Sequence, residues 1–203
     1  MNVCRIPFPD GLRRLVLAVP AIAIACALQF AHAGPPAAAR LQPAQSRIAF
    51  VTKQMGVPVE GSFGHFEADI AFDPRQPDGG SVVLQIDMAS ASLGVAQSDA
   101  ELPRPQWFDS TRFPRASFRS TAIKALGAGQ FEVAGRLTLK GHAEDVLVPV
   151  QITQSGGNSV ATGSFTVRRL AFKVGDGEWT DTSVVANDVQ VRFKLVLDGL
   201  GPL

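Results

Sequence analysis

Few side chains in this sequence could carry out chemistry. Beyond residue 33 the chain holds two histidines, His65 in "SFGHFE" and His142 in "KGHAED". Several predicted strands separate them, whereas a metal site in a protein usually needs three or four ligands. His142 with Glu144 and Asp145 therefore offers a weak site at most. We predict neither a metal nor another cofactor.

Asp109 is the most interesting acid, because it lies among large rings in "WFDSTRFPRASFRST" (107–121). Apolar burial could raise the pKa of its carboxyl group toward that of a working general acid. An aspartate in such a place more often caps a turn or pairs with a neighbouring arginine. No G-x-S-x-G nucleophile motif accompanies it, and "GDGEW" (175–179) lacks the lysine of a phosphate-binding loop. We predict that the protein is not an enzyme, with a hydrolase of hydrophobic substrates, acting through Asp109 or His65, as the alternative.

The dominant pattern in this chain is the alternation of apolar and polar side chains, not a set of reactive groups. The alternation is strongest in "HFEADIAF" (65–72), "SVVLQIDM" (81–88), "QFEVAGRLTLK" (130–140) and "VQVRFKLVL" (189–197). This is the period of antiparallel strands that bury one face. Weaker runs of the same kind lie at 46–53, 57–63, 116–124, 146–154 and 160–168.

Short turn signals separate these runs, and no pattern is long enough for a packed crossover helix. An antiparallel sheet with one apolar face either pairs with a second sheet or closes into a barrel. Local connections and long strands favour closure. We therefore predict an all-β fold, an antiparallel up-and-down barrel of about eight strands, interrupted by a short helical or loop excursion near 96–115. Such a barrel is filled by its own side chains or holds one apolar ligand.

The aromatic composition fits an apolar interior. Eleven of the thirteen phenylalanines follow residue 33, and the chain has no tyrosine. Rings without a hydroxyl suit such an interior, because a buried hydroxyl needs a hydrogen-bond partner. The pattern alone leaves open whether the interior is a cavity or a packed core.

The first 33 residues have the pattern of a secretory signal peptide. A basic segment precedes the apolar run "LVLAVPAIAIACAL" (15–28), and "AHA" (31–33) fits a cleavage site. We predict cleavage after Ala33 and a periplasmic protein, with a lipoprotein-type cut before Cys26 as the weaker alternative. A flexible lead-in at 34–45, rich in Pro and Ala, would come before one domain at 46–198.

The chain beyond residue 33 carries 16 basic and 17 acidic side chains, a net charge of −1. This balance gives no attraction to nucleic acid or to anionic lipid headgroups. Both cysteines lie in the predicted signal peptide, so the exported domain must be held by its core alone.

Four segments follow one another in a familiar order: "SRIAFVTKQMGVPVEGSFGHFEADIAFDP" (46–74), "LPRPQWFDSTRFPRASFRST" (102–121), "VAGRLTLKGHAEDVLVPV" (133–150) and "FTVRRLAFKVGDGEW" (165–179). They resemble the H/S-x-I-x-F and G-x-F-x-x-F, F-D-x-x-x-F/Y-P-x-x-x-F-x-S, G-x-L-T-x-x-G-x-x-x-x-V-x-x-P-V and R-x-x-F-x-x-G segments of the YceI-like family. The first strand departs from the family in Arg47 and in "PAQ" before Ser46.

This resemblance implies an extended lipocalin-like barrel that binds a long isoprenoid lipid, quinone-like or prenyl-phosphate, in its interior. It also implies a periplasmic protein that is often dimeric, needs no metal, and has relatives that work beside membrane cytochrome b proteins. We therefore expect an exported lipid carrier, with a homodimer and a cytochrome b partner as further expectations. A stress-linked periplasmic interaction protein with a packed interior is the other alternative.

The expected ligand-binding residues combine the inward strand positions with the rings of the excursion. Trp107, Phe108 and Phe113 would pack on one end of the barrel, and Arg169, in the family's arginine position, would face a polar headgroup or pair with a carboxylate such as Asp188. The full set is Phe50, Phe66, Ile70, Phe72, Leu84, Ile86, Trp107, Phe108, Phe113, Phe118, Phe131, Val133, Leu137, Phe165, Arg169, Val191, Phe193 and Leu195.

Overall fold

A computed structural model of the chain describes Met1 and residues 38–203. The predicted signal peptide lies outside the described residues, as do the first four residues of the predicted lead-in. The strands are β1 (Ala38–Leu41), β2 (Arg47–Gln54), β3 (Val57–Phe63), β4 (Phe66–Ala71), β5 (Ser81–Asp87), β6 (Ala91–Ser92), β7 (Arg115–Gly127), β8 (Gln130–Leu139), β9 (His142–Ser155), β10 (Asn158–Arg168) and β11 (Asp188–Asp198). The one α-helix of the described residues is α1 (Ala96–Asp99), and short 3-10 turns lie at Pro43–Gln45, Pro77–Gly79, Met88–Ser90, Arg169–Phe172 and Gly177–Thr180.

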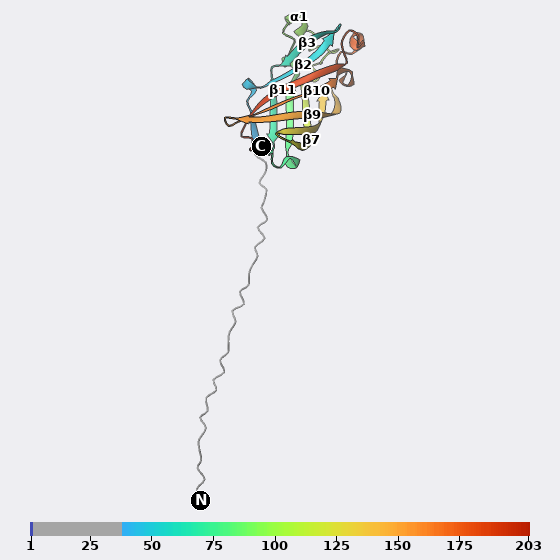
Figure 1. The fold of residues 1–203 in the computed structure, drawn as a ribbon. Helices are drawn as coiled ribbons and strands as arrows, with labels where there is room; N and C mark the ends of the chain where they lie inside the picture. The colour runs from blue at the N-terminus through green and yellow to red at the C-terminus, as the bar shows by residue number, and fades with distance from the viewer. Residues whose placement is uncertain (2–37) are drawn as a thin grey trace. The chain divides into compact units, whose positions relative to one another are not determined.

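Eight antiparallel strands close into a barrel. Hydrogen bonding runs in the order β1, β4, β5, β7, β8, β9, β10, β11, and β11 returns to β1 through the pairs Arg40↔Asp198 and Leu41↔Leu197. The five strands from β7 to β11 pair in sequence order; tight turns join the first four, and a long connection joins β10 to β11. Figure 1 labels β7, β9, β10 and β11 of this run. The predicted all-β barrel is confirmed, and each of the nine predicted strand runs coincides with a strand.

The closing strand β1 lies within the segment predicted as a flexible lead-in, so that prediction was wrong for 38–41. These four residues, rich in Ala, show no alternation of apolar and polar side chains. Their strand conformation depends on pairing with β4 and β11. β1 and β2 share the edge of β11, with a break at Pro43–Gln45 between them. The Ser46 hydroxyl bridges this break, since it donates to the Gln42 carbonyl at 2.8 Å and accepts from the Val196 amide at 2.9 Å.

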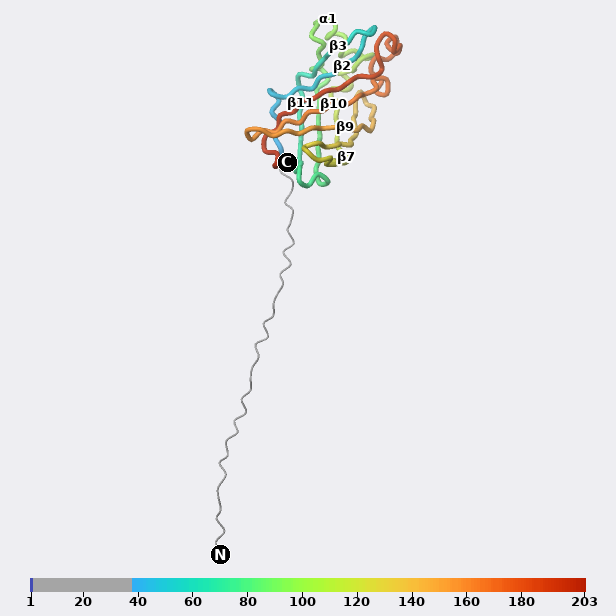
Figure 2. The backbone as a smooth tube through the Cα atoms, in the orientation of Figure 1, coloured from blue at the N-terminus to red at the C-terminus, as the bar shows by residue number. Residues whose placement is uncertain are grey.

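The two ends of the barrel differ. One end, which we call the mouth end, carries the β2–β3 turn, α1, the β8–β9 turn and the long connection 169–187 from β10 to β11; α1 and this connection lie at the top of Figure 2. The other end, the base end, carries the β4–β5 connection, the tight β7–β8 and β9–β10 turns, and the C-terminus. The loops are therefore concentrated at the mouth end.

The excursion that the sequence predicted near 96–115 contains α1 and a loop that folds over the mouth end. Leu102 and Phe108 of this loop are buried against Phe172 and Val174 of the connection 169–187. Trp107 packs on Trp179, with ring centroids 5.3 Å apart. The short helix is thus confirmed, and apolar contacts hold the excursion against the barrel. Within the described part of the chain, no helix is long and apolar enough to cross a membrane.

Candidate ligand-binding cavity

The barrel is hollow. A cavity of about 590 Å³ extends along its interior and is lined almost entirely by apolar side chains. On β11 the lining residues are every second residue from Val189, at the mouth end, to Leu197, at the base end. These eight residue steps correspond to about 26 Å of strand. The volume lies within the range of about 300–1,000 Å³ that holds small-molecule ligands.

Most of the predicted site residues line this one cavity. Sixteen of the eighteen do so: Phe50, Ile70, Phe72, Leu84, Ile86, Trp107, Phe108, Phe118, Phe131, Val133, Leu137, Phe165, Arg169, Val191, Phe193 and Leu195. They come from seven of the strands, from the residue after β4, from the excursion and from the turn after β10. The structure therefore brings together residues that lie up to 145 positions apart in the sequence.

Two predicted site residues lie elsewhere. Phe66 packs into the buried core cluster of the barrel but does not line the cavity. Phe113 is half-buried at the β8–β9 turn, where a Cβ atom on Gly141 would come within 2.8 Å of its ring. The Arg112 guanidinium lies 5.2 Å from the centre of the same ring. Phe113 therefore packs at the mouth end, as predicted, but on the β8–β9 turn, and it does not line the cavity.

Strand glycines keep the lumen open. A Cβ atom on Gly61 would lie 2.3 Å from the tip of the Phe50 ring, and the equivalent distances are 2.3 Å from Gly135 to Phe118 and 2.4 Å from Gly163 to Phe193. Real non-bonded carbon atoms stay about 3.5–4.0 Å apart. Each of these rings therefore rests on a position of a neighbouring strand that has no side chain.

This arrangement places three phenylalanine rings against the wall instead of in the middle of the barrel. Gly61 pairs with Phe50, and Gly163 with Phe193, directly across neighbouring strands. Because the rings lie flat on glycine backbone, the space at the centre is left empty. The inward glycines can be found in the sequence, but their place opposite or next to a phenylalanine depends on the register between strands.

Arg169 has a different role from either one that the sequence predicted. Its side chain is only 3% exposed. All five N–H groups of a guanidinium can donate, and here they donate to five backbone carbonyls, those of Val174, Gly175, Trp179, Val185 and Ala186, at 2.6 to 3.0 Å. Burial lowers its pKa from the usual value.

These five hydrogen bonds fasten the connection between β10 and β11. Arg169 makes no ion pair with a carboxylate of the described residues, so the predicted pairing with Asp188 was wrong. The left-handed backbone at Gly175 (φ +71°) also lets the guanidinium approach, since a Cβ atom there would lie 2.4 Å from Nη1. Arg169 lines the cavity as a structural centre of the mouth end, with no N–H group left for a headgroup.

A small set of polar groups, of which only Glu101 is charged, marks the mouth end of the cavity. Thr52 and Gln54 continue the inward positions of Ile48 and Phe50 along β2, so this strand changes from apolar to polar as it nears its turn. Gln97, Ser98 and Glu101 add further polar groups from α1 and the residues after it. The Thr52 hydroxyl oxygen is buried and has no hydrogen-bond partner in the described structure. None of these five residues was predicted from the sequence.

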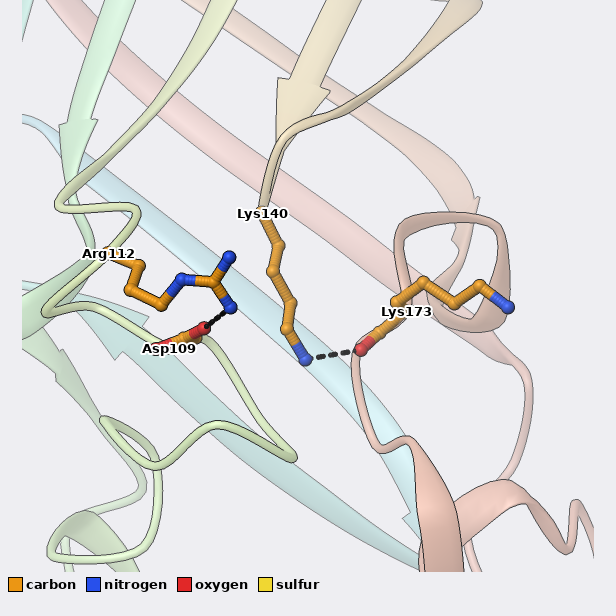
Figure 3. Close-up of polar contacts among 4 residues, drawn as sticks. All are labelled: Asp109, Arg112, Lys140 and Lys173. Carbon is orange, nitrogen blue, oxygen red and sulfur yellow. Dashed lines mark hydrogen bonds and ion pairs between the residues drawn. The ribbon is translucent and has the colours of Figure 1, made fainter.

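A second polar cluster lies at the mouth end, outside the cavity lining (Figure 3). Asp109 is buried and pairs with Arg112, whose Nη1 lies 3.3 Å from Oδ2. The buried Lys140 donates from Nζ to the carbonyl of Lys173 at 2.6 Å. Burial lowers the pKa of Lys140, an effect that Asp176 and Asp109 partly oppose. The cluster joins the excursion, the β8–β9 turn and the connection 169–187.

The residues of the hydrolase alternative are not positioned for a substrate in the lumen. Asp109 pairs with an arginine, as the more common interpretation had it, and does not line the cavity. His65 is exposed between β3 and β4 and also does not line the cavity. Among the described residues, no three His, Cys, Asp or Glu side chains are grouped so that they could hold a metal ion.

Solved structures share this fold. The crystal structure of BcnA from Burkholderia cenocepacia superposes with a TM-score of 0.75 at 43% identity, over 77% of this chain and 98% of that one. A polyisoprenoid binding domain from Saccharophagus degradans, implicated in plant cell wall breakdown, matches with a TM-score of 0.64 over 82% of this chain and 99% of that one. A Campylobacter jejuni YceI protein matches with a TM-score of 0.63 over 68% of this chain and 83% of that one. The last two are 16% and 19% identical, respectively, so they show the fold alone.

Curated relatives match over part of their length. A UPF0312 protein of Vibrio cholerae is 28% identical over 114 residues, which are 56% of this chain and 60% of the relative. A UPF0312 protein of Yersinia pestis is 31% identical over 112 residues, 55% and 58% of the two chains. The profile of the YceI-like domain matches residues 40–197, nearly the whole described barrel. The chain therefore belongs to the YceI-like family.

Proposed function

We propose that the protein is a carrier that holds one long-chain isoprenoid, or a similar amphiphilic lipid, in the barrel, and that it is not an enzyme. The observation that carries this proposal is the hollow apolar lumen between the mouth end and the base end. A packed core would not need three inward glycines that hold phenylalanine rings against the wall. The same hollow lumen argues against an interaction protein with a packed interior.

The mechanism is burial of apolar surface. Each methylene group that moves from water into the lumen contributes about 0.8 kcal/mol, before the cost of immobilising the ligand. A linear chain suits a lumen that is long along the strands, because it contacts the whole length of β11 without widening the barrel. The binding of polyisoprenoid by the Saccharophagus degradans domain, of the same fold, supports this class of ligand.

Export to the periplasm belongs to this proposal. It is supported by the signal-peptide pattern of residues 1–33, which lie outside the described structure. The mass of the protein recovered from a periplasmic extract tests it, with a chain that begins at Gly34 expected. A chain that keeps residues 1–33, or that carries lipid on Cys26, would contradict the predicted cleavage. The homodimer and the cytochrome b partner stay predictions.

Tryptophan fluorescence offers a direct test of binding. The chain has two tryptophans, Trp107 and Trp179, and both line the cavity. A prenyl quinone that enters the lumen should quench them, with saturation at one molecule per protein. The same titration in urea, where the barrel is unfolded, should show no saturation. A folded protein whose fluorescence does not respond to prenyl quinones of any tail length would contradict the proposal.

A further inference from the structure

We propose that the ligand ends in an uncharged, hydrogen-bonding headgroup, such as a quinone ring or an alcohol, and that the mouth rejects a prenyl phosphate with the same tail. This inference rests on the proposed carrier function and adds the chemical class of the headgroup. It follows from the charges and hydrogen-bond partners of the residues around the cavity.

Charged groups are nearly absent from the cavity lining. Of its 41 residues, only Glu101 and Arg169 are charged. Arg169 already donates every guanidinium N–H group to a backbone carbonyl. Glu101 is negative and pairs with Arg104 at 3.1 Å, and Arg104 does not line the cavity. A phosphate at the mouth would therefore meet one carboxylate and no free cationic donor.

Such a site is unfavourable for a phosphate. A phosphate monoester carries about −1.5 to −2 charges near neutral pH, and proteins hold such groups with arginine forks, lysines or backbone amides at helix starts. The buried Lys140 does not line the cavity, and its amine donates to the Lys173 carbonyl instead. A charge that is removed from water without a partner costs several kcal/mol.

The groups that are present fit an uncharged head. Thr52 offers a buried hydroxyl without a partner, which can donate to a quinone carbonyl or accept from an alcohol. Gln54, Gln97 and Ser98 also line the cavity and add amide and hydroxyl groups of both kinds. Thr52 lies beyond Phe50 on the way to the turn of β2, so a head at this depth leaves the whole apolar lumen to the tail.

Three ligands with the same four-isoprene tail test the inference. Menaquinone with this tail serves as the quenching probe for Trp107 and Trp179. Geranylgeraniol and geranylgeranyl diphosphate then compete with it, below the concentration at which each forms micelles. We expect the alcohol to compete at a concentration at least tenfold lower than the diphosphate. Equal or stronger competition by the diphosphate would overturn the headgroup inference while it supports the carrier function.

The other outcomes are also distinct. If the probe itself does not bind, the carrier function fails and the headgroup question does not arise. Thr52→Val keeps the shape of the side chain but removes its hydroxyl. It should lower the affinity for geranylgeraniol by about fivefold relative to the affinity for a hydrocarbon with the same tail, as expected for one lost hydrogen bond. An unchanged ratio would remove Thr52 from the headgroup site. Glu101→Gln should reduce the difference between the concentrations at which the alcohol and the diphosphate compete, because it removes a negative charge that repels the diphosphate.

Discussion

The substitution Gly61→Ala should push the Phe50 ring into the lumen. The new methyl group would lie 2.3 Å from Phe50 Cζ and 2.7 and 2.8 Å from the two Cε atoms, which are its three nearest neighbours. A normal carbon contact of about 3.5–4.0 Å requires the ring tip to retreat by roughly 1.2–1.7 Å. The rings of Phe63 and Phe108, at centroid distances of 5.2 and 6.5 Å, limit the directions that are open to it.

Two magnitudes follow. Overpacking of this kind costs about 1–3 kcal/mol, and replacing glycine within a strand returns about 0.5–1 kcal/mol. The net loss of up to about 2.5 kcal/mol should lower Tm by up to roughly 10 °C in a domain of this size. A ring that displaces one or two methylene groups of the ligand, at about 0.8 kcal/mol each, should weaken binding by about 4- to 15-fold.

The assay compares Tm and the prenyl quinone titration across three variants. Gly64→Ala is the matched control, because its new methyl group would only touch Ser90 at an ordinary 3.7 Å. The double variant Gly61→Ala with Phe50→Leu removes the ring that collides, so affinity should recover toward the original value. Unchanged affinity in a folded Gly61→Ala protein would refute the role of glycine in keeping the lumen open.

Three further predictions concern the mouth end. Arg169→Lys leaves at least two buried carbonyls without a donor and should lower the free energy of unfolding by about 2–5 kcal/mol in urea, whereas a change below about 0.5 kcal/mol would contradict the structural role. The pKa of Lys140 is lowered by burial, so the unfolded chain binds this proton more tightly and the contribution of Lys140 to stability should rise with pH up to about 10.5. The unfolding free energy of the unmodified protein, minus that of Lys140→Met, should therefore rise with pH when it is measured from pH 7.5 upward. A difference that stays constant or falls would contradict the lowered pKa of Lys140. Trp107→Ala removes the ring that packs on Trp179 and should speed ligand dissociation about tenfold while the protein stays folded by circular dichroism; equal loss of fold and binding would instead identify a structural plug.

The sequence predicted the wall of the cavity well, because the period of a strand determines which side chains share a face. Val191, Phe193 and Leu195 line the lumen as their alternation indicates. The sequence could not show that the lumen is hollow. That property depends on where a ring lies relative to a glycine of the neighbouring strand, as with Phe193 and Gly163, and hence on the register between strands.

The loops could be predicted less well, for a related reason. Arg169 and Phe113 follow no alternation, so their contacts depend on how the mouth-end segments pack together. β1 was missed because its four residues are ordered by pairing with β4 and β11, not by a local pattern. Thr52 and Gln54 could have been found, since they continue the inward positions of β2 and differ only in being polar.

The most direct test of the carrier function is the native mass of the protein, purified from its host without detergent. We expect a species heavier than the polypeptide by one lipid of several hundred daltons, which organic solvent releases as a prenyl chain with an uncharged head. A bare polypeptide that also takes up no added prenyl quinone would contradict it.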